Sequence, residues 1–302
     1  MTDTQHFDAV IIGGSYSGLS AAMALGRSLR KVLIIDSGKP CNRQTPHSHN
    51  FITQDGEKPN TIAEKAKSQV LKYDTVTFLN DLAISGEKTE HGFTITTQSG
   101  LSVMTKKLVF SAGIKDIMPD IPGFSECWGI SVIHCPYCHG YEFRNQINAI
   151  MANGERAFHL ASMVYNLTKS VVILTSGKAD FTEDQIAKFN KNNIKIIETE
   201  ITAMEHESGK IKNVVFKDAT KLSVDAVYAS LPFEQNSDIP AALGCELTEL
   251  GYIKTDPFQK TTSNGIYACG DSTSMMRAVA NAFYTGNITG AMINKELVDE
   301  EF

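Results

Sequence analysis

The segment from residue 7 to residue 36 constrains the fold more than any other part of this 302-residue chain. An apolar run at residues 7–12 leads into the turn Gly13-Gly14-Ser15-Tyr16-Ser17-Gly18, and a helical pattern follows. A second apolar run, residues 32–35, ends in Asp36. This order predicts the βαβ unit of a doubly wound α/β sheet. Exposed amides at such a turn bind pyrophosphate, and an acid at the end of the second strand accepts ribose hydroxyls.

The turn therefore predicts a dinucleotide site, although one position departs from the usual pattern. Ser15 stands where the G-x-G-x-x-G pattern has its middle glycine, and serine is the smallest substitute. The alternative is a tight turn that binds no nucleotide, and the complete strand–turn–helix–strand–acid context argues against it. The residues predicted to contact the dinucleotide here are Gly13, Gly14, Ser15, Tyr16, Ser17, Gly18 and Asp36.

Two of the six cysteines, Cys135 and Cys138, have the spacing of a motif. In a reducing compartment, a C-x-x-C pair beside a βαβ pattern indicates a redox-active dithiol. A zinc site would need a second such pair or two histidines at ligand spacing, and the nearest candidate is His47-x-His49 near Cys41. We therefore predict a redox dithiol and no metal site.

A second βαβ-like unit follows the cysteines. Residues 147–150 and 171–174 are apolar runs, and a turn at residues 152–157 and a helical pattern lie between them. Near the other end of the chain, a predicted strand ends in Gly270-Asp271, before a predicted helix over residues 277–293. A carboxylate at that strand end suits a sugar-like chain, and the helix N-terminus suits the other end of the same cofactor.

Together these motifs predict two Rossmann-like, three-layer α/β domains, the second inserted in the first. The N-terminal and C-terminal motifs share one cofactor domain, because both are shaped for the same dinucleotide. Prolines at 119 and 122 mark a connector. We place the cofactor domain at residues 1–115 and 247–302, and the dithiol-bearing domain at residues 116–246.

Composition and charge argue against nucleic acid as a partner and against a membrane-spanning segment. The chain is 42% apolar and 21% charged, with a net charge of −6, which disfavours nucleic acid because phosphate contacts need a basic face. No apolar run reaches the roughly 18 residues that cross a bilayer. The N-terminus lacks the basic start and apolar run of a signal peptide, so we expect a cytoplasmic protein.

The order and spacing of these motifs resemble the low-molecular-weight thioredoxin reductases, a family of FAD-dependent disulfide oxidoreductases, over essentially the whole chain. The glycine turn, residues 111–113, the C-x-x-C followed by Gly140, residues 144–146 and residues 265–271 carry the resemblance. It implies that the first domain binds FAD and that the second is NAD(P)-binding-like. It also implies that Cys138 lies against the flavin and that Cys135 exchanges with the substrate.

The resemblance implies further FAD contacts beyond the first turn. These are Asn42, Asn50, Asp81, Gly270, Asp271, Arg277, Ala278 and Val279. It also implies a homodimer and a thiol or disulfide substrate, which is either a thioredoxin-like protein or a small dithiol.

Two departures from the family pattern bear on the reaction. The family usually has aspartate after the second cysteine as proton donor or acceptor, and this chain has His139, a residue that can fill the role with an ordinary pKa near ~6.5. The resulting Cys-Pro-Tyr-Cys-His-Gly-Tyr-Glu sequence resembles the branch that contains the dithiol oxidases of gliotoxin and holomycin. We predict that Cys135, Cys138 and His139 are the catalytic residues.

The second departure is in the predicted nicotinamide site. The family's G-x-G-x-x-A turn is replaced by Ala152-Asn153-Gly154-Glu155-Arg156-Ala157, so the first glycine is lost. Glu155 would repel a pyrophosphate from the helix N-terminus. Only Lys178 is available near the next strand end for a 2′-phosphate. NADPH use stays open at this point, because Arg156 could compensate for weak binding.

We therefore predict an FAD-dependent thiol/disulfide oxidoreductase that is thioredoxin-reductase-like and has an eroded NADPH site. It would work as a dithiol oxidase or as a reductase with another electron donor. Two alternatives stay open: an ordinary NADPH-dependent thioredoxin reductase, and a non-catalytic flavin redox sensor.

Overall fold

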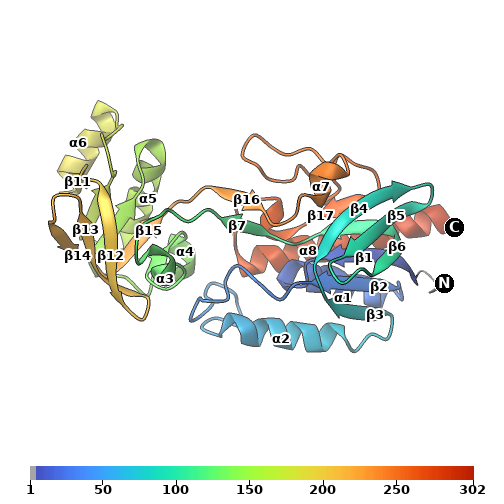
Figure 1. Ribbon diagram of the computed structural model, residues 1–302. Helices are drawn as coiled ribbons and strands as arrows, with labels where there is room; N and C mark the ends of the chain where they lie inside the picture. The colour runs from blue at the N-terminus through green and yellow to red at the C-terminus, as the bar shows by residue number, and fades with distance from the viewer. Residues whose placement is uncertain (1–4) are drawn as a thin grey trace. The chain divides into compact units, whose positions relative to one another are not determined.

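The chain forms two compact α/β units in the computed structural model, which describes residues 5–302 (Figure 1). The first unit comprises the chain up to Arg43, Glu57–Lys115 and Phe233–Phe302. The second comprises Gln44–Gly56 and Asp116–Pro232. The predicted fold class, two Rossmann-like units, is confirmed.

The first unit is built on a seven-stranded sheet in the order β3-β2-β1-β6-β5-β4, with β17 paired to β6. The strands β3, β2, β1, β6 and β17 are parallel, and β5 and β4 continue the sheet antiparallel. The strands are β1 (Gln5–Ile12), β2 (Val32–Asp36), β3 (Val76–Asn80), β4 (Ala83–Thr89), β5 (Gly92–Thr97), β6 (Ser102–Phe110) and β17 (Ile266–Ala268). The helices are α1 (Tyr16–Arg27), α2 (Pro59–Val70), α7 (Ile239–Ala242), α8 (Val279–Glu301) and the 3₁₀ turn η1 (Gly270–Ser272).

Buried side chains on both faces of this sheet explain why its central strands are continuously apolar. On one face, Ile11 and Ile34 pack with Leu25 of α1 and Ile293 of α8. On the other face, the core includes residues of β5, α7 and the following loop. Figure 1 shows the blue N-terminal strands and the red C-terminal helix in this one unit, so the unit is assembled from both chain ends.

Helices α1 and α8 approach closely because α8 presents glycine to α1. A Cβ at Gly286 would stand 2.1 Å from the Ser17 carbonyl oxygen, and one at Gly290 would stand 2.5 Å from the Ala21 carbonyl oxygen. Only glycine allows this spacing, which brings the first turns of both helices into the same region of the unit.

The second unit has a central parallel sheet in the order β11-β10-β9-β15-β8. These strands are β8 (Val132–Ile133), β9 (Asn148–Met151), β10 (Val171–Leu174), β11 (Lys195–Ile197) and β15 (Ala226–Ala229). An antiparallel sheet of three strands comprises β12 (Ile201–Glu207), β13 (Lys210–Phe216) and β14 (Lys221–Ser223). The helices are α3 (Phe124–Cys127), α4 (Pro136–His139), α5 (Gly154–Leu167) and α6 (Glu183–Lys191).

The two faces of the parallel sheet of the second unit carry different layers. Ile150 and Ile173 pack with Val164 of α5 and Phe189 of α6. The opposite face packs against the antiparallel strands, for example through Met204. The unit therefore has three layers, and the dithiol segment follows β8 at one edge of its central sheet.

The compact units differ from the expected division of the chain at two places. Residues 233–246, expected with the dithiol-bearing domain, lie in the first unit, because Ile239 and Leu243 pack into its core. Residues 44–56, expected with the FAD domain, group with the second unit. The chain passes from the first unit to the second at Asp116 and returns to the first at Phe233. At these two places, β7 (Ile114–Asp116) and β16 (Phe233–Gln235) pair in a two-stranded sheet. The assignment of the units as FAD-binding and NAD(P)-binding-like domains stays a prediction.

Candidate functional site: a dinucleotide turn, a disulfide and a histidine cluster

The turn after β1 is closed by contacts that leave no room for side chains. Gly13 has φ +105°, and a Cβ there would stand 2.4 Å from the Ser111 carbonyl. A Cβ at Gly18 would stand 1.9 Å from the Gly13 carbonyl oxygen. Strand β2 brings Asp36 to the same turn, where its carboxylate accepts a hydrogen bond from the Gly14 amide. The turn therefore keeps a bare backbone that a ligand can approach, with a carboxylate beside it.

The first amides of α1 carry no side-chain cap. Ser15, the N-cap, makes no side-chain hydrogen bond to them, and no acidic residue lies in the first turn. Helix α8 starts in the same way, with the N-cap Ala278 uncapped by a side chain and no acid after Val279 in its first turn. Such helix ends attract negative charge. The residues present thus fit FAD, whose pyrophosphate and flavin pyrimidine end both call for hydrogen-bond donors.

Two further predicted FAD residues support the same turn from its sides. The Tyr16 hydroxyl donates to the Pro59 carbonyl oxygen at 3.0 Å and accepts from Asn42 Nδ2 at 3.2 Å. Burial raises the pKa of Tyr16 by more than the Asn42 hydrogen bond lowers it, so the phenol stays protonated. Asn42 is thereby fixed next to the start of α1.

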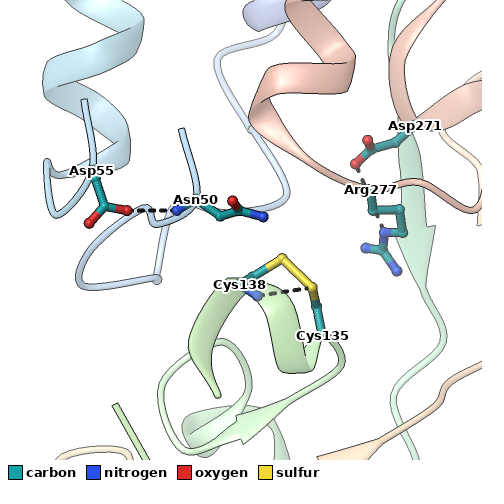
Figure 2. The surroundings of a disulfide bond; sticks show 6 residues. All are labelled: Asn50, Asp55, Cys135, Cys138, Asp271 and Arg277. Carbon is teal, nitrogen blue, oxygen red and sulfur yellow. Dashed lines mark hydrogen bonds and ion pairs between the residues drawn. A yellow bond between two sulfur atoms is a disulfide. The ribbon is translucent and has the colours of Figure 1, made fainter. Parts of the chain in front are cut away.

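The remaining predicted FAD residues are mostly in the same unit. The Asp81 amide donates to the Asp36 carbonyl oxygen at 3.0 Å, and hydrogen bonds from Ser99 and Thr97 hold the pKa of Asp81 at about 2. Asp271 lies in η1 with a carboxylate oxygen 3.9 Å from Arg277 Nε (Figure 2).

Gly270 and Asn50 complete the predicted FAD set. Gly270 has φ +74°, and its amide donates to Thr285 Oγ1 of α8 at 3.1 Å, which ties η1 to that helix. Asn50 differs from the others, because it lies in the second unit, where its amide donates to Asp55 at 2.7 Å (Figure 2). The first unit thus brings together every predicted FAD residue except Asn50. Their contacts with FAD stay predictions.

The dithiol of the second unit is present as a disulfide. Cys135 and Cys138 are bonded, with Cα atoms 5.3 Å apart (Figure 2). Cys135 is the N-cap of α4, and the Cys138 amide donates to its sulfur at 3.2 Å. Pro136 at the first helical position fixes this turn, since proline needs no amide partner there. Both cysteines are partly exposed, as exchange with a substrate requires.

His139 follows the disulfide and lies in a small cluster of titratable groups. Its ring meets the ring of His49 edge-on, with centroids 6.3 Å apart and planes at 89°. His49 in turn has Nε2 3.6 Å from Glu142 Oε1 and Nδ1 3.7 Å from Asp55 Oδ1. Burial, followed by the charge of His49, lowers the pKa of His139, and Glu142 opposes both effects. At neutral pH the His139 imidazole is therefore a neutral base.

The second βαβ turn is filled by its own side chains. Asn153, the N-cap of α5, accepts hydrogen bonds from the amides of Gly154 and Asp180, both at 2.9 Å, and donates to the Lys178 carbonyl oxygen at 2.9 Å. A Cβ at Gly154 would stand 3.8 Å from a carboxylate oxygen of Asp180. Glu155, in the first helical turn, accepts from Gln185 Nε2 at 2.7 Å. A capped amide and two carboxylates thus lie at the start of α5, where the sequence predicted the contact with a pyrophosphate.

Sequence reasoning missed two parts of this arrangement. Neither His49 nor Glu142 was predicted to lie beside His139, although the polar segment with two histidines was a weak signal for His49. The bonding of Asn153 to Asp180 was also missed, and no local pattern signals it. Among residues 5–302, no group of three or more His, Cys, Asp or Glu residues is arranged to hold a metal ion. No helix within that range has the length and apolar content needed to cross a membrane.

Comparison with known proteins gives consistent matches along the chain. A family model described as pyridine nucleotide-disulphide oxidoreductase matches residues 7–286. The thioredoxin reductase tcpT of Claviceps purpurea is 30% identical, over 99% of this chain and 96% of its own length. The thioredoxin reductase aclD of Aspergillus oryzae is 29% identical, over 98% of each. An oxidoreductase structure from Agrobacterium tumefaciens has a TM-score of 0.91 at 32% identity and covers 97% of this chain and 99% of its own.

Proposed function

We propose that this chain, which belongs to the pyridine nucleotide-disulphide oxidoreductase family, is a dithiol oxidase that makes little use of NADPH. Membership confirms the resemblance seen in the motifs. It also makes the chain an FAD-dependent, thioredoxin-reductase-like oxidoreductase that acts on sulfur groups. The proposal adds the direction of electron flow: out of a dithiol substrate, through the Cys135–Cys138 disulfide, to molecular oxygen.

The contrast between two helix N-termini carries the proposal. The first turn of α1 has an uncapped end and no acid, which suits a pyrophosphate. The first turn of α5 is capped by Asn153, contains Glu155 and faces Asp180. A pyridine nucleotide would have to displace the Asn153 cap and approach two carboxylates, both of which cost binding free energy. The chain therefore keeps one dinucleotide site and obstructs the other.

The chemistry of the cysteines balances without a nicotinamide. A substrate thiolate attacks Cys135 Sγ, the Cys135–Cys138 bond breaks, and Cys138 leaves as a thiolate. The second substrate thiolate attacks the mixed disulfide, which releases Cys135 and the oxidised substrate. The substrate has then lost two electrons and two protons, and the enzyme holds a dithiol. The Cys138 amide, which donates to Cys135 Sγ, stabilises negative charge on that sulfur.

His139 supplies the base that this direction of flow requires. Thiols attack as thiolates, so a neutral imidazole that accepts a thiol proton speeds the exchange at neutral pH. Its lowered pKa keeps it neutral under these conditions. FAD, which the turn after β1 and the starts of α1 and α8 would hold, would supply the two-electron acceptor for the enzyme dithiol, with molecular oxygen as the final oxidant and hydrogen peroxide as its product. The assignment of Cys138 as the thiol nearer the flavin and of Cys135 as the exchanging thiol is part of the proposal.

The test is oxygen uptake by the purified holoprotein with dithiothreitol as the dithiol. We expect many turnovers, one hydrogen peroxide per oxidised dithiothreitol, and loss of both in Cys135→Ser. With NADPH and oxidised thioredoxin in place of the dithiol, we expect little turnover. Rapid NADPH-dependent reduction of thioredoxin, with no dithiol-driven oxygen uptake, would instead support an ordinary thioredoxin reductase. The homodimer and the cytoplasmic location stay predictions.

A further inference from the structure

The segment Gln44–Gly56 is held in a defined shape within the second unit. His47 Nδ1 lies 2.8 Å from the Gly56 carbonyl oxygen, and the Gly56 amide donates to the Ser48 carbonyl oxygen at 2.9 Å. Ser48 is buried, and the Asn50 amide is bonded to Asp55 (Figure 2). These contacts close the segment on itself on both sides of residue 49. The His49 ring is therefore fixed in place rather than carried on a free loop.

The ring of His49 is placed between two carboxylates and a second imidazole. Asp55 and Glu142 lie on opposite ring nitrogens, at 3.7 and 3.6 Å, and the ring of His139 lies 6.3 Å away by centroids. His49 is about one-fifth exposed at its side chain, while the two carboxylates are more open to solvent. A positive charge on His49 opposes a proton on His139 at this separation, and the carboxylate of Glu142 favours one.

We propose that His49 and Glu142 are positioning residues for His139, which together set its orientation and its readiness to take a proton from the dithiol. The inference rests on the proposed function, in which His139 acts as the base for the cysteines. His49 opposes the protonation of His139 and so keeps it available as a base. Glu142 then stabilises the proton once His139 has taken it, until water removes it.

The other titratable groups around the cluster do not carry this role. Burial, and then the charge of Glu142, raises the pKa of Tyr228, so this phenol stays neutral. Asp55 contacts His49 and is mostly exposed. His47 lies 6.3 Å from His49 by ring centroids and is exposed. His49 and Glu142 are the groups whose charges act on the pKa of His139.

The test is a titration of the histidines of the holoprotein by nuclear magnetic resonance, with ¹⁵N-labelled imidazoles. It compares one variant that removes a positive charge with one that removes a negative charge. His49→Asn should raise the pKa of His139 by about half a unit, as expected for charges roughly 6 Å apart in a largely aqueous medium, and Glu142→Gln should lower it. His159→Asn, on an exposed position of α5, removes a histidine remote from the cluster and should change nothing. The pH dependence of flavin reduction by dithiothreitol, followed anaerobically, should move in the same directions.

The outcomes are distinct for the inference and for the proposed function. If His139 titrates alike in the wild type, His49→Asn and Glu142→Gln, with unchanged flavin absorbance spectra, the inference is wrong even when dithiol oxidation proceeds. If the pKa of His139 moves as expected but dithiothreitol never reduces the flavin, the coupling of the three residues stands while the proposed function fails. Shifts of the same sign in both variants would also overturn the inference, because opposite charges must act in opposite directions.

Discussion

Replacing Glu296 with glutamine should destabilise the first unit more than any other single charge change in α8. Glu296 accepts hydrogen bonds from Lys107 Nζ at 2.7 Å, from Lys260 Nζ at 2.8 Å and from the Tyr267 hydroxyl. These partners lie on β6, on the segment before β17, and on β17 itself. One carboxylate near the C-terminus thus connects α8 to two parallel strands of the sheet.

The size of the effect follows from the pKa of this carboxyl. Partial burial alone would raise the pKa of Glu296, but the hydrogen bonds from Lys107, Lys260 and Tyr267 outweigh burial and hold it at about 2. Since an unfolded glutamate titrates at ~4.3, the lowered pKa sets an upper limit of about 3 kcal/mol of folding free energy at neutral pH, and solvent screening of this partly exposed carboxylate reduces it to about 1–2 kcal/mol. Because the folded pKa is depressed, this contribution is present above the unfolded pKa and is lost as the pH falls toward the folded one.

The assay is thermal and urea unfolding of wild type and Glu296→Gln at a series of pH values. At neutral pH we expect the variant to lose about 1–2 kcal/mol, or roughly 2–8 °C in Tm for a unit of this size. The gap between the two proteins should narrow as the pH falls from about 5 toward about 3. Asp299→Asn is the matched control, because its pair with Lys295 is exposed and is worth about 0.5 kcal/mol at most. An equal loss in both variants, or a gap independent of pH, would refute the reasoning.

Three further predictions concern the sites themselves. Glu155→Gln removes a negative charge from the first turn of α5 and should tighten NADPH binding by about tenfold, as measured by fluorescence titration. An unchanged Kd would show that this carboxylate does not obstruct the site. Gly286→Ala forces a Cβ against the backbone of α1 and should cost about 1–3 kcal/mol and loosen flavin retention, while Asn287→Ala on the exposed side of α8 should do neither. Cys138→Ser should abolish the thiolate-to-flavin absorbance band that Cys135→Ser retains; a band that persists without Cys138 contradicts its assignment as the inner thiol.

The parts of the fold that could be predicted are those fixed by neighbouring residues. The strand, turn, helix and strand predicted from residue 7 to Asp36 follow from local apolar periodicity and from glycines that only a tight turn needs, and β1 begins two residues earlier, at Gln5. The Cys135–Cys138 disulfide follows from spacing alone, because two intervening residues bring the sulfurs together in one turn. The helix expected over residues 277–293 exists, but α8 runs on to Glu301, because Lys107 pairs with acids in its last turns.

The parts that escaped prediction depend on contacts between distant segments. His49 meets His139 because the segment 44–56 packs in the second unit, and no periodicity reports such packing. The sequence alone predicted that the charge of Glu155 would repel a pyrophosphate. The hydrogen bonds of Asn153 with Asp180 and Lys178 could not be predicted, because they depend on the approach of the loop after β10 to the start of α5. The structure thus adds a physical account of the second turn that the lost glycine alone did not provide.

Anaerobic stopped-flow reduction of the oxidised flavin tests the central claim most directly, with dithiothreitol and NADPH mixed in parallel against the same holoprotein. We predict that dithiothreitol bleaches the flavin through the Cys135–Cys138 pair and that stoichiometric NADPH leaves it oxidised on the same timescale. Bleaching by stoichiometric NADPH within seconds, with dithiothreitol slower, would contradict the claim that the filled turn before α5 has closed the nicotinamide route.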